Sequence, residues 1–252
     1  MTGLSPEFRK EGPLESAAMF RAEAAGLAAL TTTGTVRVPT VLDVGADNTH
    51  SWIVLERFEL LPVSITASER LGRELAALHR RFSDRFGWDD DNFIGPTPQP
   101  NAWHDDWPEF FATQRLGYQV DLAEENGFAG PVTRGVRRLI ERLPELLAHR
   151  PRPSLLHGDL WSGNHGMLPD GTPVVFDPAV HYGDRECDLA MAALFGGFDN
   201  AFFDAYIEAW PMAAGWQQRW KVYQLYHVLN HVNLFGAGYL GQAEALVRGV
   251  GT

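Results

Sequence analysis

The sequence predicts an α+β fold in which a small sheet with one helix is followed by a helix-rich body. Strand-like segments dominate the first quarter of the chain, whereas apolar residues recur at helical spacing through most of the remainder. The pattern changes near residues 56–62, which we interpret as a hinge. We therefore expect an N-terminal lobe over residues 1–60 and a mostly helical C-terminal lobe over residues 61–252.

The composition is that of a globular protein with an acidic surface. Of the 252 residues, 45% are hydrophobic, which is enough to form a sizeable core. Asp and Glu number 32 against 21 Lys and Arg, so the net charge of −11 disfavours nucleic acid and acidic membrane surfaces as partners. The single cysteine, Cys187, cannot form an intramolecular disulfide, and no targeting or membrane-spanning segment is recognised. These observations predict a cytoplasmic location.

The first quarter is expected to contain a strand, a helix and a hairpin. Met19, Phe20 and Leu27 recur at helical spacing, and Ser16 is the candidate N-cap of their helix. A turn rich in Gly, Asp and Asn separates the two hairpin strands. The expected elements are a strand over residues 7–10, a helix over 16–31, and strands over 36–44 and 51–58 joined by a turn over 45–50.

The larger lobe is expected to be mainly helical. Leu71, Leu75 and Leu78 form one apolar stripe of its first helix. Residues 87–108 show no regular periodicity, and an irregular segment of that length in a compact chain is typically functional or disordered. Its three tryptophans argue against disorder. The expected elements are helices over 68–84, 108–126 and 133–149, strands over 154–156 and 174–177, and helices from residue 185 onward.

The strongest functional signal is LLHGDLWSGN at residues 155–164, followed by VVFDP at 174–178. Two short apolar stretches each lead to a carboxylate, Asp159 or Asp177, and Asn164 lies five residues after the first. Phosphoryl transfer from a nucleotide uses such a set, because one carboxylate takes the proton of the acceptor hydroxyl while an Asn and a second Asp hold Mg²⁺. Protein kinases keep the same order of residues. We therefore expect ATP and Mg²⁺ as cofactors, Asp159 as the catalytic base, and Asn164 and Asp177 as metal ligands.

The sequence also resembles the fructosamine-3-kinase (ketosamine-3-kinase) family, which belongs to the aminoglycoside phosphotransferase and protein-kinase-like superfamily. The resemblance covers most of the chain from Phe8 onward. It implies a protein-kinase-like bilobal fold and ATP-dependent phosphorylation of the sugar O3 of a ketosamine, after which the adduct becomes unstable and deglycates. Besides HGDLWSGN, the resemblance rests on FDPAVHYGDRECDLAMAALFGGF (176–198), DNFIGPTPQPNAWHDDWPEFFATQRLGYQ (91–119) and YQLYHVLNHVNLFGAGY (223–239).

The resemblance implies roles for residues of the nucleotide site. Lys10 would hold the nucleotide phosphates and Glu23, on the following helix, would be its ion-pair partner. Adenine would bond to backbone groups near Glu56, Arg57 and Phe58.

It likewise implies roles near the acceptor. Trp161 would stack on the sugar or on the amine substituent, and His231 and Asn233 would face the sugar. Asp188 would open a helix and accept hydrogen bonds from the backbone of the catalytic loop. The expected partner is a small ketosamine, such as a fructosamine or ribulosamine, or a glycated protein.

One departure from the family concerns the small lobe. The family has two more strands and a phosphate-covering loop before the lysine, whereas only nine residues precede Lys10 here. The lobe is therefore expected to be truncated, with three strands and an uncovered sheet edge.

Two other functions remain open on the sequence alone. Acidic residues at 89–91 and 105–106 could attract a polycation, so the acceptor could be an aminoglycoside or an amino alcohol. The missing phosphate loop would also suit a nucleotide-deficient binding protein. A zinc site at His227 and His231 is disfavoured, because no third ligand has suitable spacing.

Overall fold

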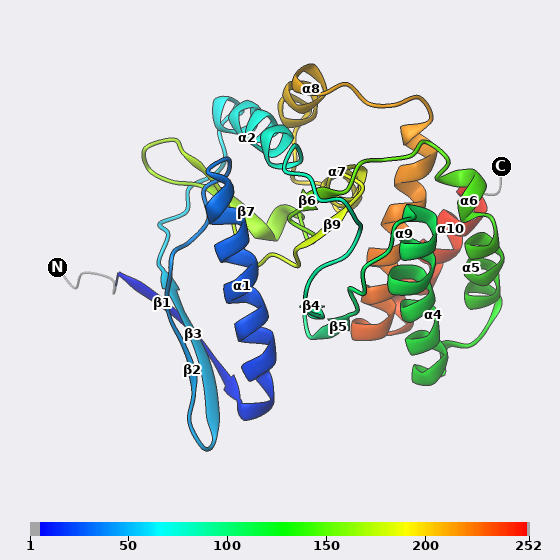
Figure 1. Cartoon of the computed structure of the whole chain (residues 1–252), viewed down its shortest axis with the longest axis horizontal. Helices are drawn as coiled ribbons and strands as arrows, with labels where there is room; N and C mark the ends of the chain where they lie inside the picture. The colour runs from blue at the N-terminus through cyan, green and yellow to red at the C-terminus, as the bar shows by residue number, and fades with distance from the viewer. Residues whose placement is uncertain (1–5, 251–252) are drawn as a thin grey trace.

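The computed structural model describes residues 6–250, and its N-terminal part is an antiparallel sheet with one helix beside it (Figure 1). The strands lie in the order β1 (Glu7–Pro13), β3 (His50–Glu56) and β2 (Val41–Ala46), so β1 is an edge strand. A 3₁₀ turn, η1 (Leu14–Ser16), leads from β1 into α1 (Ala17–Thr33). We call residues 6–56 the sheet region; it has the three strands that the sequence predicts.

The register of the sheet fixes which way the β1 side chains face. Lys10 is paired with Ile53, and Phe8 with Leu55. Side chains that are directly opposite in a sheet share a face, and Ile53 and Leu55 are buried in the cluster that also contains Phe20 of α1. Lys10 is therefore presented toward α1.

Two details of the sheet region differ from prediction. Ser16 does not cap α1: its backbone is helical and its side chain makes no capping hydrogen bond, because η1 runs directly into the helix. The second strand begins at Val41 rather than at residue 36. Val36 and Val38 are nevertheless buried, and Arg37 between them pairs with Val174 of the following region, so this stretch is core without belonging to the sheet.

Helices make up most of residues 61–250, which we call the helical body. The first, α2 (Ile65–Leu78), is capped by the Ser64 hydroxyl, which accepts a hydrogen bond from the Ala67 N–H at 3.2 Å. It ends six residues before the predicted end at 84, and the next residue, His79, is fully buried. The other helices are α3 (Trp107–Phe110), α4 (Tyr118–Ala123), α5 (Pro131–Glu141), α6 (Leu143–Leu146), α7 (Glu186–Leu194), α8 (Asn200–Ala209), α9 (Trp216–Phe235) and α10 (Leu240–Val250).

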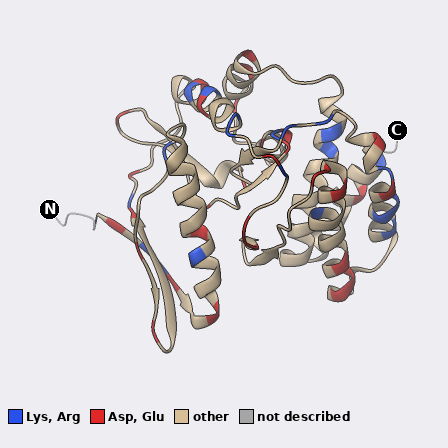
Figure 2. Cartoon of the chain, in the orientation of Figure 1, with Lys and Arg blue, Asp and Glu red and all other residues tan. Residues whose placement is uncertain are grey.

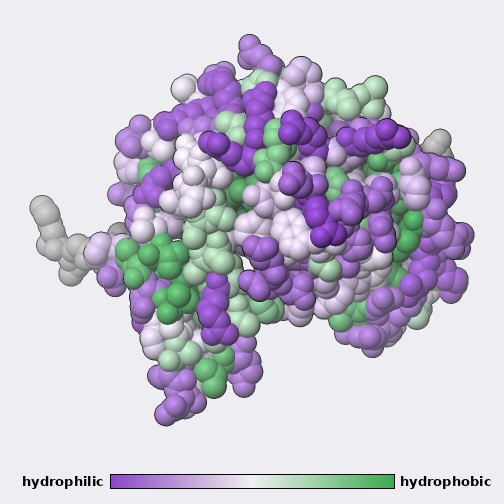
Figure 3. All heavy atoms as spheres, viewed as in Figure 1, coloured by the Kyte–Doolittle hydropathy of each residue, from purple (hydrophilic) through white to green (hydrophobic). Residues whose placement is uncertain are grey.

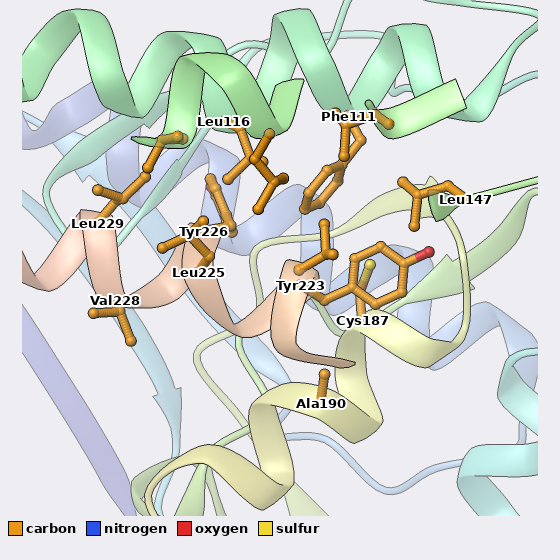
Figure 4. Packing of buried hydrophobic residues seen from close by; sticks show 14 of the residues in the cluster. Phe111, Leu116, Leu147, Cys187, Ala190, Tyr223, Leu225, Tyr226, Val228 and Leu229 are labelled. Carbon is orange, nitrogen blue, oxygen red and sulfur yellow. The ribbon is translucent and has the colours of Figure 1, made fainter. Parts of the chain in front are cut away.

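The predicted helix over 108–126 consists of several shorter pieces. Two π-helical stretches, η2 (Phe111–Gly117) and η3 (Glu124–Phe128), flank α4, and the chain then turns into α5. These pieces pack against α9 around a core that includes Phe111, Tyr223 and Tyr226 (Figure 4). Among residues 6–250, no helix is both long and apolar enough to cross a membrane.

Short hairpins and strand pairs connect the helices near the centre of the molecule. Residues 87–108 were predicted to be irregular, but they contain the hairpin formed by β4 and β5. The predicted strand over 174–177 stops at Val175, so Asp177 lies just beyond it. The pairs are β4 (Asn92–Ile94) with β5 (Thr97–Gln99), β6 (Ser154–Leu156) with β9 (His181–Gly183), and β7 (His165–Met167) with β8 (Pro173–Val175), while η4 (Ser162–Asn164) is a 3₁₀ turn and η5 (Ala237–Tyr239) precedes α10.

The surface differs between the two parts. Charged residues of both signs are interspersed over the helical body (Figure 2). The face drawn in Figure 3 is mostly hydrophilic, but apolar side chains gather over the sheet region. Phe8, Leu42 and Val44 are exposed there. Among the described residues, β1 and β2 are the two edge strands of this sheet.

Candidate functional site

A cavity of about 410 Å³ lies where α1, the β4–β5 hairpin, the loop after β6 and the loop after β8 meet. The sheet region and the helical body both contribute to it. Six of the predicted site residues line it: Lys10, Glu23, Asp159, Trp161, Asn164 and Asp177. Residues that are up to 167 positions apart in the chain are thus brought together.

The loop that carries Asp159 follows β6 through a sharp turn at Gly158. Gly158 has a φ of 86°, and a Cβ at this position would lie only 1.9 Å from the carbonyl oxygen of Ala179. Only glycine fits this close approach. The Asn164 amide then donates to the Asp159 carbonyl oxygen at 2.9 Å and to its Oδ2 at 3.2 Å. The carboxylate of Asp159 is therefore held from within its own loop.

Asp188, in the first turn of α7, binds the backbone of the same loop, as the resemblance implied. Its carboxylate accepts hydrogen bonds from the N–H groups of His157, at 2.7 Å, and Gly158, at 2.8 Å. The buried His79 contacts the carboxylate at 3.0 Å, and Tyr206 contacts the other ring nitrogen of His79 at 2.7 Å. Burial alone would raise the pKa of Asp188, but these hydrogen bonds and the neighbouring histidines hold it below its ordinary value.

Asp177 is held in an unusual backbone conformation at the other side of the cavity. Its φ of 55° lies in the left-handed region, which non-glycine residues rarely adopt. Such strain persists only where the surrounding structure fixes it, and it is typical of functional sites. The backbone carbonyl of Asp177 receives a long contact of 3.4 Å from the Asn164 amide, so the two predicted metal ligands lie next to each other.

Lys10 connects the two parts of the molecule at this point. Its Nζ lies 2.8 Å from Oε1 of Glu23 and 2.5 Å from Oδ1 of Asp177. Burial alone would lower the pKa of Lys10, but the two carboxylates outweigh it and raise that pKa. Lys10 is therefore a fixed cation at the edge of the cavity.

The electrostatic setting of Asp159 differs from that of an exposed carboxylate. Burial raises the pKa of Asp159 to about 7, and the negative charge of Asp177 acts in the same direction. A carboxylate with a pKa near neutrality is suited to accept a proton at physiological pH. The carboxyl group of Asp159 is thus the candidate base of the cavity.

Trp161 lies at the mouth of the cavity. The indole is 39% exposed, so it is not a buried loop anchor. A Cβ at Gly163 would come within 2.3 Å of its ring, which shows that the ring lies directly over that glycine. Trp161 is therefore a partly exposed aromatic residue in the lining of the cavity.

Other predicted residues lie outside the cavity. The Nδ1–H of His231 donates to the His227 carbonyl at 2.8 Å, and the ring packs against Phe195 and Tyr239. Asn233 donates to the side chain of Gln119 at 2.8 Å. The structure does not bring either residue into the lining of the cavity.

The predicted adenine stretch also lies outside this cavity. The N–H of Glu56 donates to the Thr40 carbonyl at 2.8 Å, and the N–H of Arg57 donates to the Pro6 carbonyl at 2.9 Å. The guanidinium of Arg37 lies over the ring of Phe58 at 4.9 Å. The N–H groups of Glu56 and Arg57 are therefore already engaged within the protein.

Sequence reasoning missed one group of lining residues. Met19 of α1 and Phe93, Gly95 and Pro96 of the β4–β5 hairpin all line the cavity. The available signal was the string DNFIGPTPQPN, which the family resemblance had singled out without assigning it a role.

A second cluster of candidate ligands lies elsewhere in the helical body. His149, Asp184 and Glu186 have ligand atoms within 4.8 Å of one another. His149 is bonded to Asp184 at 2.7 Å, and the Tyr223 hydroxyl donates to Asp184 at 2.5 Å. Arg219 pairs with both oxygens of Glu186, at 2.6 and 2.9 Å. The carboxylates of this cluster are therefore already engaged by His149, Tyr223 and Arg219 within the helical body.

Both sequence and structure comparisons relate this chain to fructosamine and ketoamine kinases. The model of the fructosamine kinase family matches residues 4–250. A probable ketoamine kinase of Synechocystis sp. is 48% identical over 234 residues, which cover 91% of this chain and 78% of that protein. The solved structure of a candidate fructosamine-3-kinase from Haemophilus somnus superposes with a TM-score of 0.90 at 32% identity, covering 97% of this chain and 83% of that one.

More distant structures show the fold. A choline kinase from Streptococcus pneumoniae superposes with a TM-score of 0.68 at 16% identity, covering 97% of this chain and 85% of that one. At this identity the likeness shows the fold alone. It confirms the predicted α+β, protein-kinase-like fold.

Proposed function

The chain belongs to the fructosamine kinase family and is a kinase, and we propose that it transfers the γ-phosphoryl group of ATP to the O3 hydroxyl of a ketosamine. The observation that carries this proposal is that the half-buried Asp159 lines the same cavity as the Lys10, Glu23 and Asp177 cluster. The sheet region and the helical body would act as two lobes, with the nucleotide between them.

In the proposed reaction, Asp159 accepts the proton of the acceptor hydroxyl as that oxygen attacks the γ-phosphorus in line with the leaving ADP oxygen. Asn164 holds the carboxylate in place through its amide N–H group. The raised pKa of Asp159 favours proton acceptance near neutral pH. No covalent enzyme intermediate is needed, because positioning and charge stabilisation supply most of the catalysis in this chemistry.

The residues present fit a bound Mg²⁺. Both predicted ligands, Asn164 and Asp177, line the cavity and offer oxygen atoms, the donor type that Mg²⁺ prefers. The Asn164 amide nitrogen is engaged with Asp159, which directs its amide oxygen elsewhere. When bound, the ion would neutralise charge on the nucleotide phosphates. Lys10, kept in place by Glu23, would bind the same phosphates.

The acceptor side of the cavity suits a sugar that carries an amine. Trp161 follows the proposed base by two residues, so its exposed ring would stack on the sugar. The acidic residues that would attract a polycation are partly engaged: Asp105 pairs with Arg85 at 2.7 Å, and Asp91 accepts from the Asn101 N–H at 2.8 Å. This favours a ketosamine over an aminoglycoside as the acceptor.

The proposal is tested by measuring ADP formation with Mg·ATP and a panel of acceptors. The panel comprises a fructosamine, a ribulosamine, a glycated peptide, kanamycin and choline. Turnover is expected on the ketosamines and not on kanamycin or choline. The Asp159→Asn variant serves as the matched control for contaminating kinases. Turnover restricted to kanamycin or choline, or ketosamine binding without any ADP formation, would overturn the proposal.

A further inference from the structure

We infer that Phe93 is a second aromatic contact of the acceptor site and selects acceptors by the apolar substituent on their amine. This inference rests on the proposed function and adds a specificity-determining residue to it. It follows from the position of the β4–β5 hairpin, from the buried contacts that fix the hairpin, and from the chemistry of the cavity.

Phe93 lies on the partly exposed side of strand β4, where it lines the cavity. Asn92 and Ile94 are buried, whereas Phe93 between them is partly exposed; Phe93 lines the same cavity as Asp159 and Trp161, and Asn92 contributes to that lining as well. Successive side chains of a strand point to opposite faces. The turn that follows is made by Gly95 with a φ of 58°, a conformation that glycine adopts without strain.

A network of buried amides holds the hairpin rigidly. Gln99 donates to the side-chain oxygen of Asn92 at 2.7 Å and accepts from the hydroxyl of Tyr226 on α9 at 2.7 Å. Asn101 donates to the same Asn92 oxygen at 2.9 Å, and the buried Arg115 donates to Asn101 at 2.7 Å. The Nε of Arg115 has no hydrogen-bond partner, but the amide contacts of Asn92, Gln99 and Asn101 link the hairpin to α9 and favour a single arrangement of it.

The same network fixes the hairpin relative to the catalytic loop. Asn92 donates to the Val180 carbonyl at 2.7 Å, and Gln99 donates to the Ala179 carbonyl at 3.2 Å. The N–H of Ala179 in turn donates to the carbonyl of His157, two residues before Asp159, at 2.8 Å. Phe93 is therefore held at a set position with respect to Asp159, as a residue that reads substrate shape must be.

The chemistry of the cavity suggests what Phe93 contacts. Trp161 belongs to the loop of Asp159 and would lie beside the sugar that is phosphorylated. Phe93 belongs to a separate element, and Met19 and Pro96 are further apolar residues of the same lining. A ketosamine consists of a sugar and a substituted amine. Because Trp161 is assigned to the sugar, Phe93 would contact the substituent on the amine. An aromatic ring there would contact an apolar substituent and the adjoining ammonium group.

Two acceptors with the same sugar test this assignment: 1-deoxy-1-benzylaminofructose and 1-deoxy-1-methylaminofructose. In Phe93→Ala, kcat/KM for the benzyl acceptor should fall about tenfold, while kcat/KM for the methyl acceptor should change by less than about twofold. Calorimetry without nucleotide should show the same selective loss in Kd. Phe93→Leu keeps an apolar side chain and should retain activity on the benzyl acceptor within about threefold of wild type.

Pro98→Ala is the matched control. Pro98 is the exposed cross-strand partner of Phe93 and does not line the cavity, so its replacement should leave both acceptors unchanged. Three results would overturn the assignment of Phe93 but not the proposed function. They are equal losses of kcat/KM on both acceptors in Phe93→Ala, no loss on either acceptor, or the same selectivity change in Pro98→Ala. A wild-type protein that phosphorylates neither acceptor would overturn the proposed function and this assignment with it.

Discussion

On the side of the helical body, the loop that carries Asp159 is fixed by buried hydrogen bonds, whereas on the side of the sheet region Lys10 is held by two ion pairs. Asp188 alone accepts from two backbone N–H groups and contacts the buried His79. The side chain of Lys10 remains 25% exposed, and one of its partners, Asp177, is 43% exposed. Buried hydrogen bonds define a position more strictly than partly solvated ion pairs.

This difference indicates a division of labour in the site. The proposed base, Asp159, and its supporting loop are fixed within the helical body by buried hydrogen bonds. The cation that would meet the phosphates is held less tightly, so it can exchange a carboxylate for a phosphate oxygen when a nucleotide binds. Replacements on the helical-body side should therefore affect chemistry and folding, whereas replacements on the sheet side should affect nucleotide binding.

The largest effect is expected from Asp159→Asn. The variant keeps the size and the hydrogen-bonding position of the side chain but cannot accept the proton, so kcat should fall about 10²- to 10⁴-fold. Steady-state ADP formation measures this effect, and circular dichroism should show an unchanged fold. A near-normal kcat would remove Asp159 from the proposed role.

The second prediction concerns Asp188→Asn and protein stability. The amide cannot accept from both backbone N–H groups and His79 as the carboxylate does, so the free energy of unfolding should fall by about 3 kcal/mol. Urea unfolding at pH 7 measures the change. A loss below about 1 kcal/mol, the scale of an ordinary neutral hydrogen bond, would show that Asp188 is not the anchor of the loop.

The same carboxylate gives a pH dependence. Because the folded-state pKa of Asp188 is lowered, its stabilising contribution is complete above the unfolded pKa of about 3.9 and is lost as the pH falls through the folded value. The difference in stability between wild type and Asp188→Asn should therefore shrink progressively below about pH 4. A difference that stays constant or grows on acidification would contradict the assigned direction of the pKa shift.

The third prediction addresses the sheet side through Lys10→Met. Hydrogen bonds to charged groups typically contribute about 1.5–3 kcal/mol, so the Kd for Mg·ATP should rise about tenfold or more. The free energy of unfolding should change by less than about 1 kcal/mol, because the ion pairs of Lys10 are partly solvated. Calorimetry and urea unfolding measure the two quantities. A large loss of stability with normal affinity for Mg·ATP would contradict the claim that Lys10 serves nucleotide binding rather than folding.

The smallest effect is expected from Trp161→Ala. The KM for the ketosamine should rise by the equivalent of about 1–2 kcal/mol while the KM for ATP stays nearly constant, because stacking on the sugar is a ground-state contact. Kinetics with each substrate varied in turn separate the two values. If both KM values rise together and thermal stability falls, Trp161 is a packing residue.

The parts of the site that the sequence predicted share one property. Asp159, Asn164 and Asp177 are brought together by short strands and tight loops, so their spacing in the chain nearly determines their arrangement in space. Lys10 and Glu23 required the family resemblance in addition, because nothing local to β1 indicates which carboxylate its lysine will meet. The structure brings all five to one cavity.

The parts that could not be predicted depend on tertiary contacts. The strands β4 and β5 have three residues each and include Pro98, so they carry no periodicity that could indicate a hairpin. They form because Asn92 and Gln99 find partners at Val180, Ala179 and Tyr226.

The sequence also could not predict which elements the side chains of α9 contact. His231 and Asn233 were expected at the sugar, but the side chains that α9 turns to other elements are set by packing against Phe195, Tyr239 and Gln119.

The most direct test of the account is the identity of the product. The wild-type protein should convert 1-deoxy-1-benzylaminofructose and Mg·ATP into ADP and a sugar phosphate monoester, which ³¹P and ¹³C NMR should locate at O3. The Asp159→Asn variant should form none of this ester above the background. Release of inorganic phosphate without a sugar ester, or formation of the O3 ester by the variant at the wild-type rate, would contradict the account.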